Sequence, residues 1–156
     1  MGLFSFKNKK SVVVCPVNGE VLPITSSEDK VFAEKMMGDG FVVKPKSGEF
    51  FSPVNGNVSM VFETKHAIAF TTNDGFDVLV HIGMDTVKLN GEGYEVLVSD
   101  GDKVKIGQKI ANVDLDVIRK KGYLTDTPVV ITNLDGKEIS LLKIGECNVS
   151  DEIINL

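Results

Sequence analysis

The sequence predicts an all-β fold: an antiparallel β-sandwich with internal duplication and one or two short helices. Three observations indicate this fold class. Short strand-like stretches recur along the 156 residues, turn dipeptides such as Asn55-Gly56 and Asp74-Gly75 separate them, and one corner motif occurs twice. Regularly spaced strands with turn signals between them are typical of β-sandwiches and barrels.

The expected strands are short and follow one another along the whole chain. In order, they are Ser11–Val14, Val42–Lys44, Asn57–Phe62, Lys65–Thr71, Phe76–Ile82, Tyr94–Val98, Lys109–Val113 and Pro128–Thr132. Helical content is expected to be small. The segments Asp29–Met37 and Leu115–Lys121 can each form about two turns of helix.

The corner motif has the pattern PVNGxV. It lies within Cys15–Val21 and again within Ser52–Val58. A proline followed by an Asn-Gly turn makes a tight corner that leads into a strand. We therefore expect the same corner to be used twice, as in a duplicated architecture.

Composition and charge exclude several classes of function and structure. The formal net charge is −5 and the sole arginine is Arg119, which argues against a nucleic-acid partner and favours a basic protein partner. Cys15 and Cys147 are expected to be reduced thiols, and no apolar run has the length of a transmembrane helix. Residues 1–10 are expected to form a flexible tail and residues 11–156 a single domain.

The chain contains two histidines, and both fall in one expected hairpin. If Asn73-Asp74 forms a two-residue loop, His66 pairs directly with His81; if Asp74-Gly75 forms it, the histidines become diagonal neighbours. A loop with an odd number of residues would place them on opposite faces. Two imidazoles within reach of one ligand can bind a metal or handle a phosphoryl group.

An even loop would create one face that carries both histidines. Strand alternation then adds apolar residues and a threonine to that face, while the alanines and valines of the hairpin point to the core. The expected histidine face consists of Phe62, Thr64, His66, Ile68, Phe70, Leu79, His81 and Gly83, and the expected core face of Ala67, Ala69, Val78, Val80 and Ile82.

Several segments, in the same order along the chain, closely resemble the glucose-type IIA components of the bacterial phosphoenolpyruvate-dependent sugar phosphotransferase system. GFDVLVHIGMDTV resembles the signature around the phosphorylated histidine of that family. The other matching segments are VFAEKMMGDGFVVKP, SPVNGNV, FETKHAIAF, KLNGEGYEVLVSDGDKVKIGQKI and TDTPVVITN. The resemblance covers nearly everything after the first ten residues, and implies one IIA-type phosphocarrier domain.

The resemblance implies a phosphotransferase component that acts through a phosphohistidine. His81 would accept a phosphoryl group on Nε2 from the phosphohistidine of HPr and pass it to a cysteine on the IIB domain of a membrane permease. His66 would stabilise the phosphoryl group and be needed for its donation, and Thr64 would orient the ring of His66. Gly83 would let the backbone approach the phosphate closely.

The resemblance also implies a partner surface, formed by an apolar ring with acids at its edge. Asp29 and Asp85 would meet arginines on HPr. The ring would consist of Val31, Phe32, Met37, Phe62, Leu79 and Val87.

No cofactor is expected, and the location implied by the resemblance is the cytoplasm, with membrane contact only through the permease. An intrinsic metal is not expected either, because two imidazoles make an incomplete zinc site. His66 and His81 would be zinc ligands only if a partner shared the ion with them.

Two alternative functions are weighed against the phosphocarrier. The segment Ser99–Ile110 resembles the hairpin of biotinyl- or lipoyl-type carriers, but these need a lysine at a hairpin tip, and the nearest similar string, Glu34-Lys35-Met36, precedes that hairpin. A zinc peptidase of related β architecture would fit the spacing of His81 and Asp85. It needs further histidines that this chain lacks.

Overall fold

The computed structural model describes residues 11–156, and the expected tail of residues 1–10 lies outside the described residues. All strand pairings between the named strands of the described part are antiparallel. The all-β fold class is thus confirmed. The strands are β1 (Val12–Val14), β2 (Gly19–Pro23), β3 (Asp39–Pro45), β4 (Glu49–Phe51), β5 (Gly56–Val61), β6 (Ala67–Thr72), β7 (Asp77–His81), β8 (Tyr94–Val96), β9 (Lys103–Val104), β10 (Lys109–Val113), β11 (Thr127–Ile131), β12 (Gly145–Cys147) and β13 (Glu152–Asn155).

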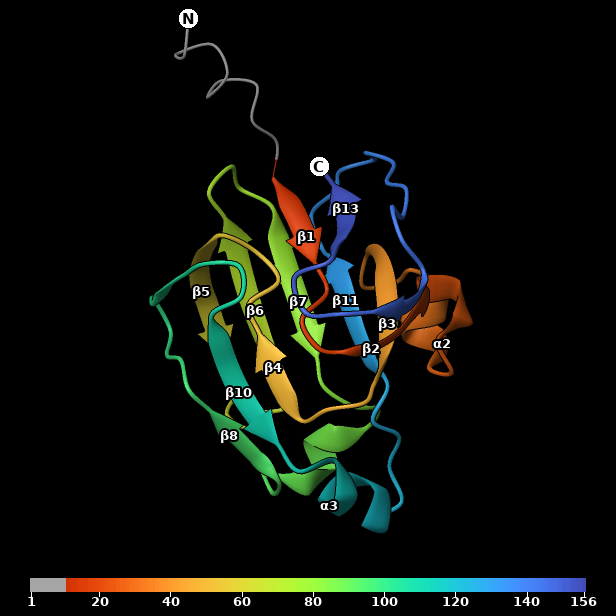
Figure 1. The fold of residues 1–156 in the computed structure, drawn as a ribbon, viewed down its shortest axis with the longest axis vertical. Coiled ribbons are helices and arrows are strands. Elements are labelled where there is room, and N and C mark those ends of the chain that lie inside the picture. Colours follow the sequence, from red (N-terminus) through yellow and green to blue (C-terminus); the bar gives the residue numbers. More distant parts are fainter. Residues whose placement is uncertain (1–10) are drawn as a thin grey trace, which may run out of the picture.

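These strands form a sandwich around one large core (Figure 1). An eight-stranded sheet has the order β12-β2-β3-β11-β7-β6-β5-β9, a three-stranded sheet has the order β4-β10-β8, and β1 pairs with β13. Phe50 of β4 and Ile110 of β10 pack in the same fully buried cluster as Phe70 of β6 and Val80 of β7. The inner faces of the two larger sheets therefore fill the core together.

Within residues 11–156 the helices are few and short, as the sequence predicted. They comprise α2 (Lys30–Ala33), α3 (Leu115–Lys120) and the 3₁₀ turns η1 (Ile24–Ser26) and η2 (Thr86–Leu89). An aspartate caps the N-terminus of each α-helix by accepting backbone N–H groups, Asp29 on α2 and Asp114 on α3. No helix of the described residues is both long and apolar enough to cross a membrane.

The first helix is shorter than the predicted Asp29–Met37. It ends at Ala33, because Lys35 adopts a left-handed conformation with φ of 60°. The N–H of Lys35 bonds to the carbonyl of Phe32, which closes a tight turn instead of continuing the helix.

The repeated corner is used twice, as expected. The N–H of Val14 donates to the carbonyl of Pro53, and the N–H of Phe51 donates to the carbonyl of Pro16, both at 2.8 Å. The residue directly before each copy thus donates a backbone hydrogen bond to the proline of the other copy. The two copies therefore make equivalent contacts, as an internal duplication predicts.

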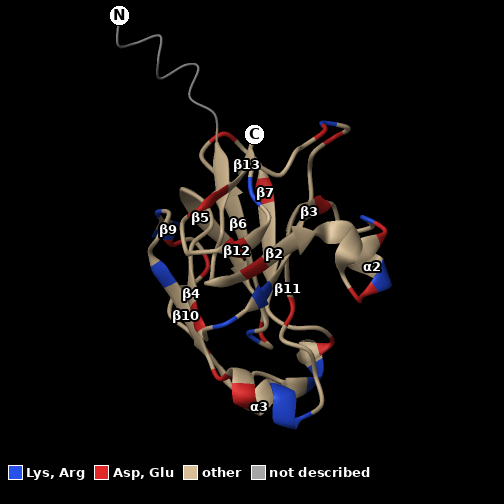
Figure 2. Ribbon diagram, turned by 45° about the vertical axis from the view of Figure 1, so that its right-hand side comes forward, with Lys and Arg blue, Asp and Glu red and all other residues tan. Residues whose placement is uncertain are grey.

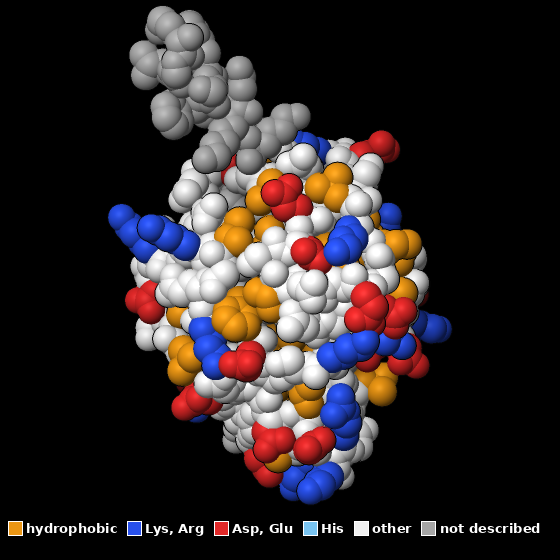
Figure 3. All heavy atoms as spheres, in the orientation of Figure 1, with side chains coloured by type: hydrophobic (Ala, Val, Ile, Leu, Met, Phe, Trp, Pro, Cys, Tyr) orange, Lys and Arg blue, Asp and Glu red, His pale blue; other side chains and the backbone are white. Residues whose placement is uncertain are grey.

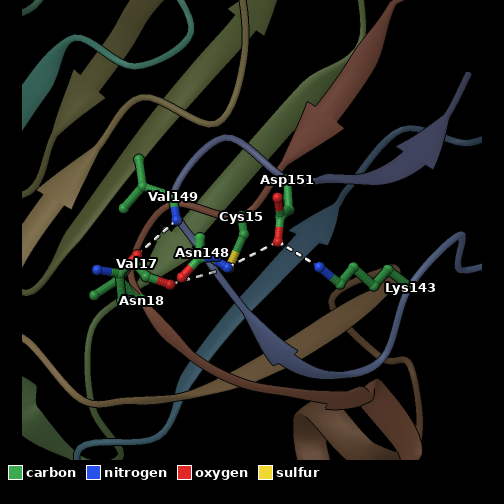
Figure 4. A network of polar contacts seen from close by, with 7 residues as sticks. All are labelled: Cys15, Val17, Asn18, Lys143, Asn148, Val149 and Asp151. Atoms are coloured by element: carbon green, nitrogen blue, oxygen red, sulfur yellow. Dashed lines mark hydrogen bonds and ion pairs between the residues drawn. The ribbon is translucent and has the colours of Figure 1, made fainter.

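The asparagines of the two corners also play the same part. Figure 4 shows the first copy, where Oδ1 of Asn18 accepts the N–H of Val149 at 2.7 Å. In the second copy Oδ1 of Asn55 accepts the N–H of Ile106 at 2.9 Å. Each asparagine side chain therefore ties its corner to a later loop.

Both cysteines are free thiols, as expected. Burial raises the pKa of Cys15 to about 12, and it also raises the pKa of Cys147. Sγ of Cys15 donates to the carbonyl of Val17, inside the first corner (Figure 4). A protonated, buried thiol is a weak nucleophile, so these residues serve packing.

The hairpin register differs from the one expected. Ala67, and not His66, lies opposite His81, and the N–H of Thr72 bonds to the carbonyl of Phe76 across a three-residue loop. Gly75 takes φ of 94° in this loop, which is typical of three-residue hairpin loops. The loop therefore has an odd number of residues.

This register reverses part of the face assignment. Ile68 and Phe70, expected beside the histidines, join Val78, Val80 and Ile82 in the main core. The alanines Ala67 and Ala69, expected in that core, share the outer face with Leu79 and His81. The histidines are thus carried on the outer face of the eight-stranded sheet.

Charges of both signs are distributed over the molecule. The ribbon in Figure 2 shows basic and acidic residues on α3, and in α2 the basic residue Lys30 is flanked by the acids Asp29 and Glu34 at the two ends of the helix. Over the face shown in Figure 3, basic and acidic side chains are interspersed with apolar ones.

Candidate functional site

His81 is the last residue of β7 and is half-buried. Its Nδ1 lies 2.7 Å from the carbonyl oxygen of Gly83. A carbonyl oxygen can only accept a hydrogen bond, so Nδ1 carries the ring hydrogen and donates it. The lone pair of the neutral ring then resides on Nε2, which is the nitrogen available for nucleophilic attack.

His66 lies in the turn immediately before β6 and is only 4% exposed. Its Nδ1 is 2.7 Å from Oγ1 of Thr64, the residue that the resemblance implies would orient the ring. Lys65, between them, has φ of 64°, so this stretch departs from the alternation of a strand. That departure lets His66 reach the outer face despite the odd loop.

The two imidazoles lie against each other. Their ring centroids are 4.7 Å apart and their planes are inclined by 82°. The expected meeting of the histidines therefore occurs, although through a turn rather than through direct strand pairing.

The surroundings of both histidines lower their pKa, which favours the neutral form. Burial, followed by the proximity of His81, lowers the pKa of His66 to about 4. Burial also lowers the pKa of His81, although the Gly83 carbonyl and the negative charges of Asp29 and Asp85 oppose this effect. Neutral imidazole is the nucleophilic form, so the environment favours a nucleophile at physiological pH.

Two phenylalanines pack against the histidine pair. The ring of Phe32, from α2, lies 5.2 Å from that of His81, and the ring of Phe62 lies 5.7 Å from that of His66. Phe32 is 5% exposed and Phe62 is partly exposed. The aromatic rings restrict the access of water to one side of each imidazole.

The residues expected in the partner surface fall into two groups. Val31, Met37 and Val87 are 40–48% exposed, whereas Phe32 and Leu79 are buried in a small cluster on the outer face. The buried pair therefore lies beneath the surface. Two further exposed residues were not predicted: Met36, next to Met37, and Leu124, whose carbonyl accepts the N–H of Met84.

The two acids expected at the edge differ in exposure. Asp29 is partly exposed and caps α2 by accepting the N–H of Val31 at 2.9 Å. Asp85 is exposed and adopts a left-handed conformation with φ of 58°. Both lie near enough to His81 to favour its protonated form electrostatically.

Gly83 is needed for the turn that holds His81. Its φ is +91°, and a Cβ there would lie 2.4 Å from Cγ2 of Thr86. The close approach in the structure is thus between this glycine and a threonine side chain. Closeness to a phosphate was the reason expected from the sequence.

Sequence reasoning missed two buried hydroxyls behind the histidines. Thr86 and Tyr94 both donate to the carbonyl of Ile82. Thr86 follows Ile82 by four positions and Tyr94 follows it by twelve. Ile82 comes directly after β7, Thr86 begins the 3₁₀ turn η2 and Tyr94 begins β8, so no motif spacing predicts that they meet.

The alternatives find little support in the geometry. Lys35, the candidate for a carrier lysine, follows α2 and does not lie at a hairpin tip. Within residues 11–156, no group of three or more His, Cys, Asp or Glu side chains is arranged to hold a metal ion.

Comparison with known proteins adds an independent finding. Residues 11–136 match the family described as phosphoenolpyruvate-dependent sugar phosphotransferase system, EIIA 1. The chain is 43% identical to a PTS system glucose-specific EIIA component of Oceanobacillus iheyensis, over 97% of this chain and 94% of that protein.

Two further similarities extend this result. The chain is 47% identical to the PTS system glucose-specific EIICBA component of Staphylococcus carnosus, over 92% of this chain but 21% of that longer protein. The solved structure of glucose permease IIA from Mycoplasma capricolum matches with a TM-score of 0.90 and 39% identity, covering 96% of this chain and 97% of that one.

These matches confirm the resemblance to glucose-type IIA components that the sequence motifs indicated. They agree with the antiparallel sandwich and cover the segments that carry both histidines. The chain therefore belongs to the EIIA 1 family of the phosphoenolpyruvate-dependent sugar phosphotransferase system.

Proposed function

We propose that the chain is a phosphocarrier for sugar uptake. It accepts a phosphoryl group from the phosphohistidine of HPr and passes it to the cysteine of a IIB permease domain. The observation that carries the proposal is the adjacent imidazole pair. In this pair the Gly83 carbonyl accepts the Nδ1 hydrogen of His81, which leaves the lone pair of Nε2 free. Residues 11–156 would act as one unit in the cytoplasm, with membrane contact only through the permease.

In the first transfer, Nε2 of His81 attacks the phosphorus of the donor phosphohistidine. A new N–P bond forms while the N–P bond of the donor breaks, and the donor imidazole leaves with the electron pair. Phosphoryl transfer has a loose transition state with charge spread over the three equatorial oxygens. Positioning and hydrogen-bond donors therefore supply most of the catalysis.

His66 would supply one such donor. When the hydroxyl of Thr64 donates to Nδ1, the hydrogen of the neutral His66 ring resides on Nε2. That N–H can bond to an oxygen of a phosphoryl group on the adjacent His81 ring. Because the pKa of His66 is about 4, this donor remains in the same state throughout the neutral pH range.

Docking would use the surface around the pair. The exposed apolar side chains of Val31, Met37 and Val87, together with Phe62, would contact either partner. Asp29 and Asp85 would pair with arginines on HPr, which fits a chain with a formal net charge of −5.

The test is phosphorylation in a defined mixture of phosphoenolpyruvate, enzyme I, HPr and the purified chain. We expect one acid-labile phosphoryl adduct in the natural chain and none in His81→Ala, because that variant lacks the nucleophile. Labelling of His81→Ala to the natural extent would overturn the assignment.

His66→Gln separates the two roles. We expect this variant to accept phosphate but to pass it to IIB about 100-fold more slowly, the usual cost of a lost transition-state donor. Donation at the natural rate would contradict the role of His66. Both variants should first show the hydrogen-exchange protection of the natural chain.

A further inference from the structure

A buried hydrogen-bond cluster lies directly behind the histidines, and the mechanism above does not use it. Its centre is the backbone of Ile82. The carbonyl of Ile82 accepts a bond from Oγ1 of Thr86 at 2.8 Å and another from the hydroxyl of Tyr94 at 2.6 Å. Its N–H donates to the carbonyl of His66 at 2.7 Å.

The cluster is shielded from water. Ile82 and Thr86 are fully buried, and Tyr94 is 6% exposed. Burial raises the pKa of Tyr94 to about 12, so its hydroxyl stays protonated and available as a donor. A carbonyl that accepts two buried hydrogen bonds cannot rotate without losing both. The two buried hydroxyls would then lack acceptors, which would destabilise the folded state.

The peptide held in this way is the one that precedes Gly83. Cγ2 of Thr86 fills the place where a Cβ of Gly83 would lie, so the threonine also packs against the turn. The Gly83 carbonyl belongs to the next peptide, whose N–H, on Met84, donates to the carbonyl of Leu124 at 3.0 Å, and the Ile82–Gly83 peptide fixes the position from which that carbonyl points. That carbonyl accepts the hydrogen of Nδ1 of His81 at 2.7 Å.

We infer that Tyr94 and Thr86 are positioning residues for the phosphoryl acceptor. Their hydroxyls fix the Ile82–Gly83 peptide, so that the Gly83 carbonyl keeps the ring hydrogen of His81 on Nδ1 and Nε2 free for attack. The catalytic meaning of this inference rests on the proposed function. The tautomer it requires is a property of the protein without any partner.

Tyr94→Phe tests the inference by removing one hydroxyl with little change of shape. Long-range ¹H–¹⁵N spectra should show signals from two histidine rings. In the natural chain, the ring of His81 should carry hydrogen on Nδ1 alone. Tyr94→Phe should show a second population with hydrogen on Nε2. Acceptance of phosphate from HPr should slow about 3- to 10-fold, the effect of one net hydrogen bond.

Matched variants separate positioning from general destabilisation. Tyr123→Phe removes the other tyrosine hydroxyl, from a ring that packs against the same core, and should leave the His81 spectrum and the rate unchanged. Thr86→Val should act like Tyr94→Phe, whereas Thr86→Ser keeps the hydroxyl and should restore most of the rate.

The spectrum is recorded on folded protein, so unfolding cannot account for a change in the tautomer of His81. Folded Tyr94→Phe and Thr86→Val with the natural His81 tautomer and the natural rate would overturn the inference. If the natural chain accepts no phosphate from HPr, the proposed function fails. The tautomer measurement still decides the positioning role in that case.

Discussion

At the residue scale, the two histidines differ in what holds Nδ1. Nδ1 of His81 bonds to the carbonyl of Gly83, whereas Nδ1 of His66 bonds to the hydroxyl of Thr64. A carbonyl only accepts, whereas a hydroxyl can donate, so the two rings can carry their hydrogens on opposite nitrogens. This difference supports the proposal that one ring acts as nucleophile and its neighbour as hydrogen-bond donor.

The low pKa of His66 predicts a specific pH dependence of stability. The pKa is about 4 in the folded chain and near 6.5 when unfolded. As pH falls between these values, the unfolded state binds a proton that the folded state does not, so stability is lost on acidification. The loss should reach up to about 3 kcal/mol below pH 4.

Urea unfolding from pH 7 to pH 4 measures this loss, with His66→Gln as the control. The variant cannot titrate at this position and should lose less stability on acidification. An NMR titration of His66 with a midpoint near 6.5 would contradict the account.

At the element scale, hairpin loop length was the feature that the sequence could not settle. Asn73, Asp74 and Gly75 suit a two-residue or a three-residue loop, and each choice moves the strand faces. The structure has the longer loop, with the hydroxyl of Thr72 bonded to Asp74 and to the N–H of Phe76. These side-chain bonds follow no simple sequence rule.

The left-handed turn at Lys65 brings His66 to the outer face despite the three-residue loop. The conformational strain of this turn lowers the free energy of unfolding by an amount that can be measured. A lysine with φ of 64° is strained, whereas asparagine tolerates this conformation better. Lys65→Asn should therefore raise the free energy of unfolding by about 0.5–1 kcal/mol. The lysine stem packs near Gly91, which reduces the gain.

Lys105→Asn is the matched control, because Lys105 is an exposed lysine without a positive φ. Urea unfolding should show little change for this variant. Equal stabilities of Lys65→Asn and Lys105→Asn would show that the turn is not strained.

At the scale of the whole molecule, the fold class, the repeated corner and the adjacent histidines could be predicted from the sequence. The corner was visible because its Asn-Gly turn has a distinct local chemistry. Strands such as β4 (Glu49–Phe51) and β12 (Gly145–Cys147) were missed, since each has three residues and no apolar alternation. Their existence depends on partners far away in the chain.

The hydroxyls that stabilise the candidate site could not be predicted from the sequence either, because their contacts also join distant parts of the chain. Thr86 and Tyr94 come from different elements and meet only because the sandwich brings them to the carbonyl of Ile82. The motifs of the EIIA 1 family could be recognised locally. The long-range bonds that hold those motifs in place could not.

We propose that Nε2 of His81 carries the phosphoryl group. Nitrogen–phosphorus coupling in NMR spectra of the ¹⁵N-labelled, phosphorylated chain identifies the bonded nitrogen directly. We expect phosphorus on Nε2 of His81, with hydrogen retained on Nδ1 by the Gly83 carbonyl. Phosphorus on Nδ1 of His81, or on either nitrogen of His66, would contradict the account.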